Sequence, residues 1–377
     1  MKTAIKKTFL NLIFFCNLGC IFLLLISNLA PLLNPSKWWP VAFTGILFPF
    51  LLIATFAFLF FWLFVQRKKT LLSFAAILIS IPNILTSFAF NLPSEFHQKK
   101  QPGSIRIVTW NVGLMNYTES DSTAIINNAI IFKKLKESDA DIICLQEFFS
   151  AVVPDNKYNL MDSIVRTMNY PYTFFSRDVP KFDEKFYSGT ILFSRYKITD
   201  SSKIIYPKPF DGSIIKTGIL INNDTIDIIT TRLQSFRFQS NEYKALSNIK
   251  RGSDSGFTGS KNIISKLRLA YKQKIGQVAI AKKLIEESKR PVIFTGDLND
   301  VPVSFAYAQL KNNMSDVWIK KGTGLGRTFQ FISPTLRIDY IFFNKYFKAL
   351  QVQKIITAGA SDHYGLTADL SLIKKEQ

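Results

Sequence analysis

Acidic residues are almost missing from the first 100 positions of this 377-residue chain, where Glu95 stands alone. The same stretch contains long runs without any charge, whereas nearly all the Asp and Glu lie beyond Gln101. This division predicts an apolar N-terminal part followed by one large folded domain. A site that needs carboxylates must therefore lie in the C-terminal part.

Cysteine and histidine are scarce as well. Of the three cysteines, Cys16 and Cys20 fall in an apolar segment and Cys144 in an expected core strand, so no disulfide framework is implied. The two histidines are His97 and His363. A catalytic histidine in the folded domain would therefore have to be His363.

Positive charge, by contrast, is plentiful. The chain has a net charge of +20, of which the residues before position 101 supply +8, so the remainder carries +12. A basic domain suits an anionic substrate or an anionic membrane surface. A Lys-rich proteome would explain the excess equally well.

Three uncharged apolar segments, residues 9–29, 41–65 and 71–90, are each long enough to span a bilayer as a helix. Pro49 and Pro82 are tolerable within such spans, because neighbouring helices can satisfy the freed carbonyl groups. A cleaved signal peptide is the rival interpretation of the first segment. The length of that segment and the two that follow favour a multi-pass anchor.

The basic flanks predict the orientation of this anchor. Lys2, Lys6 and Lys7 precede the first span and residues 67–69 separate the second from the third, whereas the loop between the first two holds only Lys37. By the positive-inside rule the N-terminus is cytoplasmic. After three spans the large domain would lie on the periplasmic or extracytoplasmic side of the cytoplasmic (inner) membrane.

The sequence divides into an anchor (1–92), a linker (93–103) and a catalytic domain (104–374). Apolar runs and turn residues predict an α/β domain in which strands outnumber helices and do not alternate regularly with them, which favours two packed sheets with helices outside. We expect strands at 104–111, 141–147, 187–194, 213–221, 225–232, 292–294, 335–344 and 365–372, and helices at 121–138, 262–288 and 304–310. Residues 243–259 are basic and rich in Gly and Ser, and are expected to form a mobile loop.

Several of these strands end in polar side chains. Asp297, Asn299 and Asp300 follow the apolar run at 292–294, and Glu147 ends another buried strand. A carboxylate at the end of an apolar strand is costly unless it is solvated or holds a cation. Taken alone, the stretch around Asp297 is better explained as an ordinary Asp/Asn-rich turn, and it is the polar ends of the other strands that favour a site.

Five short motifs together resemble the endonuclease/exonuclease/phosphatase superfamily in order and spacing. They are Trp110-Asn111-Val112, Leu145-Gln146-Glu147, Gly296-Asp297-Leu298-Asn299-Asp300, Arg337-Ile338-Asp339-Tyr340 and Ser361-Asp362-His363. The resemblance covers about residues 104–372. It implies a four-layer α/β-sandwich and Mg²⁺-dependent hydrolysis of phosphate esters.

The resemblance also implies roles for particular residues. Glu147 would be the main ligand of Mg²⁺, with Mn²⁺ as an alternative, and Asn111 and Asp362 would lie in or near the metal shell. Carboxylate and amide oxygens are the hard donors that Mg²⁺ prefers.

Four further residues would act on the substrate. Asp297 would orient or deprotonate the attacking water, and Asn299 would hydrogen-bond the phosphoryl oxygens. His363, braced by Asp339, would contact the phosphate or move a proton, as an imidazole with a carboxylate partner can do.

Arg232 departs from the family pattern. Many members carry histidine at this position, in Thr-His-Leu, whereas this chain reads Thr231-Arg232-Leu233. Arginine cannot exchange a proton near neutral pH, but it can clamp a phosphate with two hydrogen bonds. Arg232 is therefore a candidate catalytic residue, and it also raises the alternative of a catalytically impaired phosphate- or partner-binding membrane protein.

The leading hypothesis is a membrane-tethered metal-dependent phosphoesterase that acts on an anionic phosphate ester. Nucleic acid, phospholipid headgroups and sugar or inositol phosphates all remain as substrates, because no base-reading or lipid-specific motif is present. The lipid bilayer is the expected partner of the three spans. The oligomeric state is left open by the sequence.

Overall fold

The computed structural model describes residues 2–153, 158–208, 210, 212–235, 256–331 and 333–373. At helix positions 2–4, 256–264, 266 and 267 the description is limited to the backbone. Most of the expected loop at 243–259 lies outside the described residues, and its last four positions already belong to a helix.

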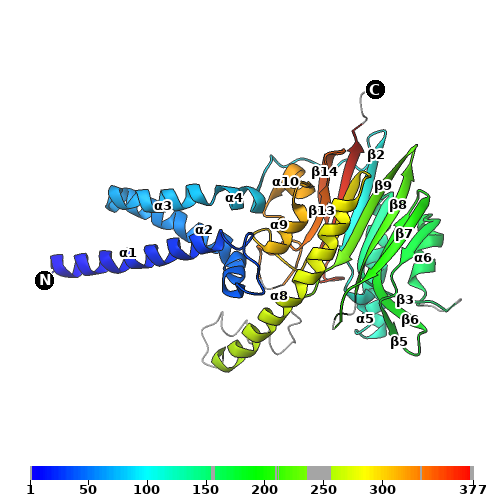
Figure 1. Ribbon diagram of the computed structural model, residues 1–377, viewed down its shortest axis with the longest axis horizontal. Helices are drawn as coiled ribbons and strands as arrows, with labels where there is room; N and C mark the ends of the chain where they lie inside the picture. Colours follow the sequence, from blue (N-terminus) through cyan, green and yellow to red (C-terminus); the bar gives the residue numbers. More distant parts are fainter. Residues whose placement is uncertain are drawn as a thin grey trace.

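Two β-sheets form the centre of the C-terminal part (Figure 1). The strands of the six-stranded sheet, in spatial order, are β11 (Ser315–Asp316), β13 (Asp339–Phe343), β10 (Val292–Asp297), β9 (Asp224–Arg232), β8 (Ser213–Ile221) and β7 (Ile198–Ile205). Those of the seven-stranded sheet are β14 (Phe347–Ile355), β15 (Gly365–Leu372), β2 (Ser104–Asn111), β3 (Ile142–Ala151), β6 (Phe186–Ser194), β4 (Tyr172–Phe175) and β5 (Val179–Lys181), the last pairing with β6. Both sheets are mixed, with parallel pairs β2–β3 and β9–β10.

The two sheets face each other, and helices cover their outer faces. Helices α5 (Asp121–Ser138) and α6 (Leu160–Met168) pack on the seven-stranded sheet, and α8 (Gly256–Glu287) and α9 (Phe305–Lys311) on the six-stranded one. Alternate residues of one strand serve different layers: Ile293 of β10 faces the other sheet and Phe294 faces the helices. This explains why the central strands are apolar on both faces.

The sequence predicted most of these elements. β2, β8, β15 and α5 have the expected bounds, and β10 and α9 lie within a few residues of theirs. The strand expected at 335–344 begins only at Asp339. Strands β7 and β14 were not predicted, because polar residues interrupt their apolar pattern. The α/β class with two packed sheets is confirmed.

Four helices precede the domain and project from one side of it (Figure 1). They are α1 (Lys2–Ser27), α2 (Trp39–Val65), α3 (Arg67–Ile79) and α4 (Ile81–Ser87). Among the described residues, α1 from Ile5 onward and α2 are each long and apolar enough to cross a membrane, and α3 with α4 would make a third crossing only as one bent span.

The expected third span, residues 71–90, differs from the structure in two ways. The helix bends by 55° between Ile79 and Ile81, since Pro82 lies in the first turn of α4 and cannot continue a preceding helix. The last two residues of the expected span form strand β1 (Ala89–Phe90), which pairs with β12 (Thr323–Gly324) of the domain. The apolar run therefore ends in the folded domain.

Candidate active site

The end of strand β10 presents Asp297, whose side chain is fully buried. The Asp297 carboxylate accepts hydrogen bonds from the backbone N–H of Asn299 (2.8 Å to Oδ1) and from its amide Nδ2 (2.9 Å to Oδ2). Asn299 Nδ2 also donates to the Leu233 carbonyl oxygen at 2.9 Å. Gly296 is required here, because a Cβ at this position would lie 2.0 Å from the Thr231 carbonyl oxygen.

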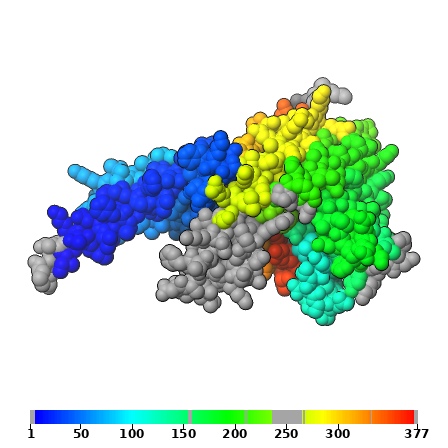
Figure 2. Space-filling view, turned by 60° about the horizontal axis from the view of Figure 1, so that its bottom comes forward, coloured from blue at the N-terminus to red at the C-terminus, as the bar shows by residue number. Residues whose placement is uncertain are grey.

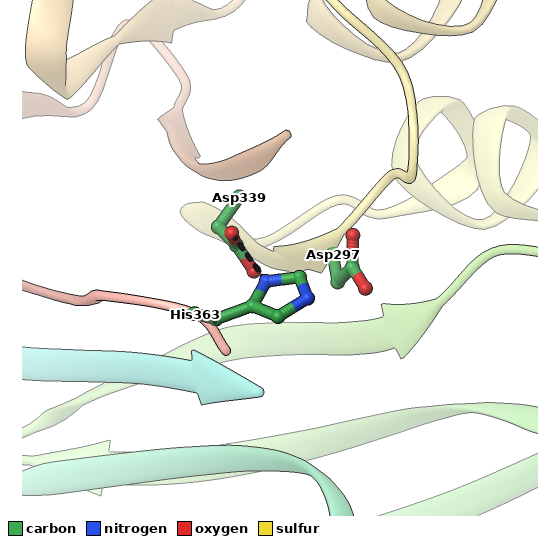
Figure 3. A group of neighbouring side chains, drawn as sticks. All are labelled: Asp297, Asp339 and His363. Atoms are coloured by element: carbon green, nitrogen blue, oxygen red, sulfur yellow. Dashed lines mark hydrogen bonds and ion pairs between the residues drawn. The ribbon is translucent and has the colours of Figure 1, made fainter. Parts of the chain in front are cut away.

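Asp339 and His363 lie beside Asp297 (Figure 3). Asp339 is directly opposite Asp297 in the antiparallel pair β10–β13. His363 Nδ1 lies 2.9 Å from Asp339 Oδ2, as the expected bracing requires. Potential ligand atoms of the three residues all lie within 4.8 Å of one another. The indole of Trp110 fixes the backbone of His363 by donating to its carbonyl oxygen at 2.9 Å.

The seven-stranded sheet contributes Asn111, at the end of β2, and Glu147 in β3. Between Leu145 and Phe148 the pairing of β3 with β6 shifts by one residue, which forms a β-bulge. Glu147 has a left-handed φ of 50° there, and such a bulge re-aims a side chain. Asn111 Nδ2 donates to Glu147 Oε1 at 3.1 Å and to Asp297 Oδ2 at 3.0 Å, so its amide joins the two sheets.

Arg232 also lies in this site. It pairs with Asp297 in the parallel register of β9 and β10. Its Nε lies 2.6 Å from Glu147 Oε1 and 3.8 Å from Asp297 Oδ2. The guanidinium therefore supplies positive charge directly beside the residue that was predicted to hold a metal.

The electrostatics of the site follow from burial and from its neighbouring charges. Burial and the charge of Asp339 raise the pKa of Asp297 to about 6. Burial alone would lower the pKa of His363, but the carboxylates of Asp339 and Asp297 outweigh it and raise this pKa to about 10. Burial would raise the pKa of Glu147, yet Arg232 holds it below its usual value. These two carboxylates thus favour the protonated form of His363.

Asp362 lies next to this cluster of charged side chains. Burial and the negative charge of Glu147 raise the pKa of the Asp362 carboxyl. The hydroxyl of Ser361 shapes this turn, because it donates to the Asn111 carbonyl oxygen at 2.8 Å and accepts from the His363 N–H at 3.1 Å. All the site residues that the sequence proposed are thus brought into one region.

Two supporting residues were missed by the sequence reasoning. Thr328 accepts hydrogen bonds from the backbone N–H groups of Ile338 (2.9 Å) and Asp339 (3.1 Å). Lys274 of α8 donates from Nζ to the Asn299 carbonyl oxygen at 2.7 Å and to Asp300 Oδ2 at 3.1 Å. Lys274 could have been found, because it is a charged residue on the apolar stripe of its helix. No sequence signal marks Thr328.

The donor set fits a hard divalent cation. Burial is the main cause that raises the pKa of both Asp297 and Asp362, and a cation held beside them would stabilise their ionised forms. Asp339 Oδ1 is buried without a hydrogen-bond partner among the described residues. The carboxylates of Glu147 and Asp362 suit Mg²⁺. The Asn111 amide points its Nδ2 at Glu147 and Asp297 and its Oδ1 at the Gly113 N–H, so it would have to turn over to offer an oxygen ligand.

Comparisons with known proteins agree with this geometry. Residues 108–363 match the model of the Endonuclease/Exonuclease/phosphatase family, and residues 10–87 match a domain of unknown function (DUF8431). No curated protein sequence matches the chain significantly.

Solved structures have the same fold. An endonuclease/exonuclease/phosphatase from Beutenbergia cavernae is 17% identical, with a TM-score of 0.50 over 71% of this chain and 72% of that one. The catalytic domain of human nocturnin with bound sulfate is 15% identical, with a TM-score of 0.50 over 73% of this chain and 96% of that one. The family match spans most of the chain, so this protein belongs to the Endonuclease/Exonuclease/phosphatase family of phosphoric ester hydrolases, whose members generally use divalent metal ions.

Proposed function

We propose that the protein is a membrane-tethered, Mg²⁺-dependent phosphoesterase, with Mn²⁺ as an alternative ion, built on a four-layer α/β-sandwich. The observation that carries this proposal is that polar side chains from the two sheets meet in one buried cluster. Asn111 of one sheet donates a 3.0 Å hydrogen bond to Asp297 Oδ2 of the other sheet, beside the Asp339–His363 pair. A buried cluster of this kind is costly unless it serves binding or catalysis.

Glu147, Asn111 and Asp362 are the proposed metal ligands. When bound, the ion would neutralise charge on the phosphoryl oxygens and orient the ester. Arg232 lies 2.6 Å from Glu147 Oε1, so its guanidinium would contact a phosphate held at the same place. Arginine suits that task because its planar fork matches two phosphate oxygens.

Asp297 is the proposed group that orients or deprotonates the attacking water. Its raised pKa brings it closer to the working pH, as general base catalysis requires. The protonated His363 would stabilise negative charge or donate a proton to the leaving oxygen. Asn299 already uses its amide hydrogens on Asp297 and Leu233. Its proposed contact with the phosphoryl oxygens would require one of these bonds to break, and otherwise it orients Asp297.

The length and apolar composition of α1 and α2 support a membrane location for this chemistry. We propose three spans, with the bent pair α3–α4 as the third, and the domain of residues 104–374 on the outer side of the cytoplasmic membrane. The substrate would be a phosphodiester or phosphomonoester in nucleic acid, a phospholipid headgroup or a sugar or inositol phosphate. The net charge of +12 beyond residue 100 favours any of these anions.

Phosphodiesterase assays on the full chain in lipid nanodiscs test the proposal. We expect hydrolysis of bis(p-nitrophenyl) phosphate with Mg²⁺ or Mn²⁺, its loss with EDTA, and a loss of at least about a hundredfold in Asp297→Asn. Glu147→Gln keeps the shape of the ligand but removes its charge, so calorimetry should show weaker Mg²⁺ binding.

One observation favours the alternative of a catalytically silent binding module. The Arg232–Glu147 ion pair at 2.6 Å can neutralise Glu147 without a metal. Phosphate binding without Mg²⁺ binding or turnover on a panel of nucleic acid, phospholipid and sugar phosphate substrates would establish that alternative and overturn the enzyme.

A further inference from the structure

The loop that leaves the candidate site runs directly to the membrane anchor. Asp297 ends β10, and Val303 follows six positions later. At about 3.3 Å per residue this segment spans at most roughly 20 Å. Whatever holds Val303 therefore acts at short range on the backbone that carries Asp297 and Asn299.

Val303 is held by the anchor. Its side chain is 1% exposed and packs in one apolar cluster with Leu24, Ala30, Phe48 and Ala76, all from the N-terminal helices and the turn after α1. The space-filling view shows the blue anchor against the yellow helix α8 (Figure 2). The domain thus inserts a residue of its active-site loop between the helices.

Gly45 of α2 makes this contact close. A Cβ at Gly45 would lie 2.1 Å from the carbonyl oxygen of Val303 and 3.1 Å from Ala30 Cβ. Backbone atoms cannot move away as the end of a flexible side chain can. Any residue other than glycine at this position must therefore push the loop away from the helix or distort the helix itself.

A second contact ties the anchor to strand β13. Buried Arg337, which is paired with Asp316, donates from Nη2 to the Thr86 carbonyl oxygen of α4 at 2.7 Å. The Tyr340 hydroxyl lies 2.6 Å from the Arg337 carbonyl oxygen and 2.9 Å from that of Asp300. This contact connects α4 with the site loop and with the strand that begins at Asp339.

A third set of contacts joins the segment after α4 to the domain. Asn91 Nδ2 donates to the carbonyl oxygens of Gly322 at 2.8 Å and Ile319 at 3.1 Å, and β1 pairs with β12. Residues 89–91, directly after α4, are therefore hydrogen-bonded to the domain, which a flexible tether would not be.

We propose that the membrane anchor positions the active-site loop. In this contact Gly45 and Val303 are positioning residues for the loop that carries Asp297 and Asn299. Lys274 holds this loop from the domain side through the Asn299 carbonyl oxygen. The helices hold it from the other side at Val303. We call the contact of Val303 with Gly45 and the apolar cluster of the anchor the seat. The catalytic effect of the seat rests on the proposed function, whereas its existence does not.

The test compares Gly45→Ala with Gly19→Ala in the full chain in nanodiscs. Both glycines lie in apolar helices, but nothing lies within 4 Å of a Cβ at Gly19. In Gly45→Ala we expect hydrogen exchange of a peptide covering 292–303 to accelerate about tenfold. On bis(p-nitrophenyl) phosphate kcat should fall about tenfold to a hundredfold, with KM within about twofold, because misplacement of catalytic groups acts on the transition state. Gly19→Ala should match the parent in both measurements.

If Gly45→Ala assembles and its loop exchanges as slowly as in the parent, the proposal is wrong. If Gly45→Ala does not assemble, Val303→Ala replaces it, since that change keeps the backbone and removes the side chain from the anchor cluster. Val303→Ala should accelerate exchange in the same peptide, and an unchanged rate would equally overturn the seat. A parent without phosphodiesterase activity would contradict the proposed function, and the exchange comparison would still decide the seat.

Discussion

Arg232 is the residue at which this chain departs most from its family resemblance. The sequence showed an arginine where many members have histidine, and the structure places its Nε 2.6 Å from Glu147 Oε1. The carboxylates of Glu147 and Asp297 raise the pKa of Arg232 although burial opposes them. Arg232 is therefore positively charged throughout the physiological range and would compete with the proposed metal for Glu147.

Arg232→Ala should change metal affinity and turnover in opposite directions. Removal of a cation beside Glu147 should tighten Mg²⁺ binding about tenfold or more by calorimetry, since a unit charge a few ångströms away is worth up to about 4 kcal/mol near a surface. Turnover at saturating Mg²⁺ should fall about a hundredfold, because one charge-assisted donor is lost.

Arg232→Lys should recover only part of this turnover, because an ammonium cannot reproduce the bidentate fork. Arg232→His distinguishes two explanations of this arginine. Higher activity would mean that arginine impairs the site, and lower activity would mean that the site is adapted to arginine. Arg195→Ala, which breaks a 2.6 Å ion pair with Asp139, is the matched control. Unchanged Mg²⁺ affinity in Arg232→Ala would contradict the competition.

At the scale of single elements, helix α8 is coupled to the site through one buried ion pair. Lys274 and Asp300 have side chains 2% and 4% exposed, and their charged atoms lie 3.1 Å apart. Burial raises the pKa of Asp300 although Lys274 opposes it. The charged form of Asp300 is therefore costly even with the Lys274 ammonium beside it.

Asp300→Asn should destabilise the folded domain by about 3–5 kcal/mol, because it leaves the buried ammonium of Lys274 without the carboxylate that neutralises it. The melting temperature of the full chain in detergent measures this. Addition of Lys274→Met should recover most of the loss. Glu137→Gln, which breaks the exposed pair with Lys134, should change the melting temperature little. An unaffected melting temperature in Asp300→Asn would show that the pair is not buried as described.

At the scale of the whole molecule, the orientation depends on whether α3 and α4 together cross the membrane. Lys69 Nζ lies 4.1 Å from the ring centre of Phe14, so the basic turn between α2 and α3 lies at the same end of the bundle as the N-terminal half of α1. Figure 1 shows the N-terminus at that far end. Both basic clusters can therefore be cytoplasmic together.

Alkaline phosphatase fused to the C-terminus should be active, because its activity requires export and three crossings place the domain outside. A fusion after residue 66, beyond two crossings, should be inactive and is the control. An inactive C-terminal fusion would mean that α3 and α4 do not cross, and it would leave the proposed chemistry untouched.

The sequence by itself determined many of the elements and which of their residues are candidates for the site. Apolar runs bounded by glycine and proline located β2 and β10, and the polar residues that end them identified Asn111 and Asp297 as site candidates. Local patterns suffice for this, because strand period and strand ends are properties of neighbouring residues.

Only the tertiary structure decided how these residues meet. The 3.0 Å bond between Asn111 and Asp297, 186 positions apart, depends on the packing of two sheets. The bulge that turns Glu147 toward Arg232 depends on a register with β6, and the seat of Val303 on Gly45 depends on an interface between helices and domain. Each is a long-range contact, and no pattern among neighbouring residues records where a distant segment will lie.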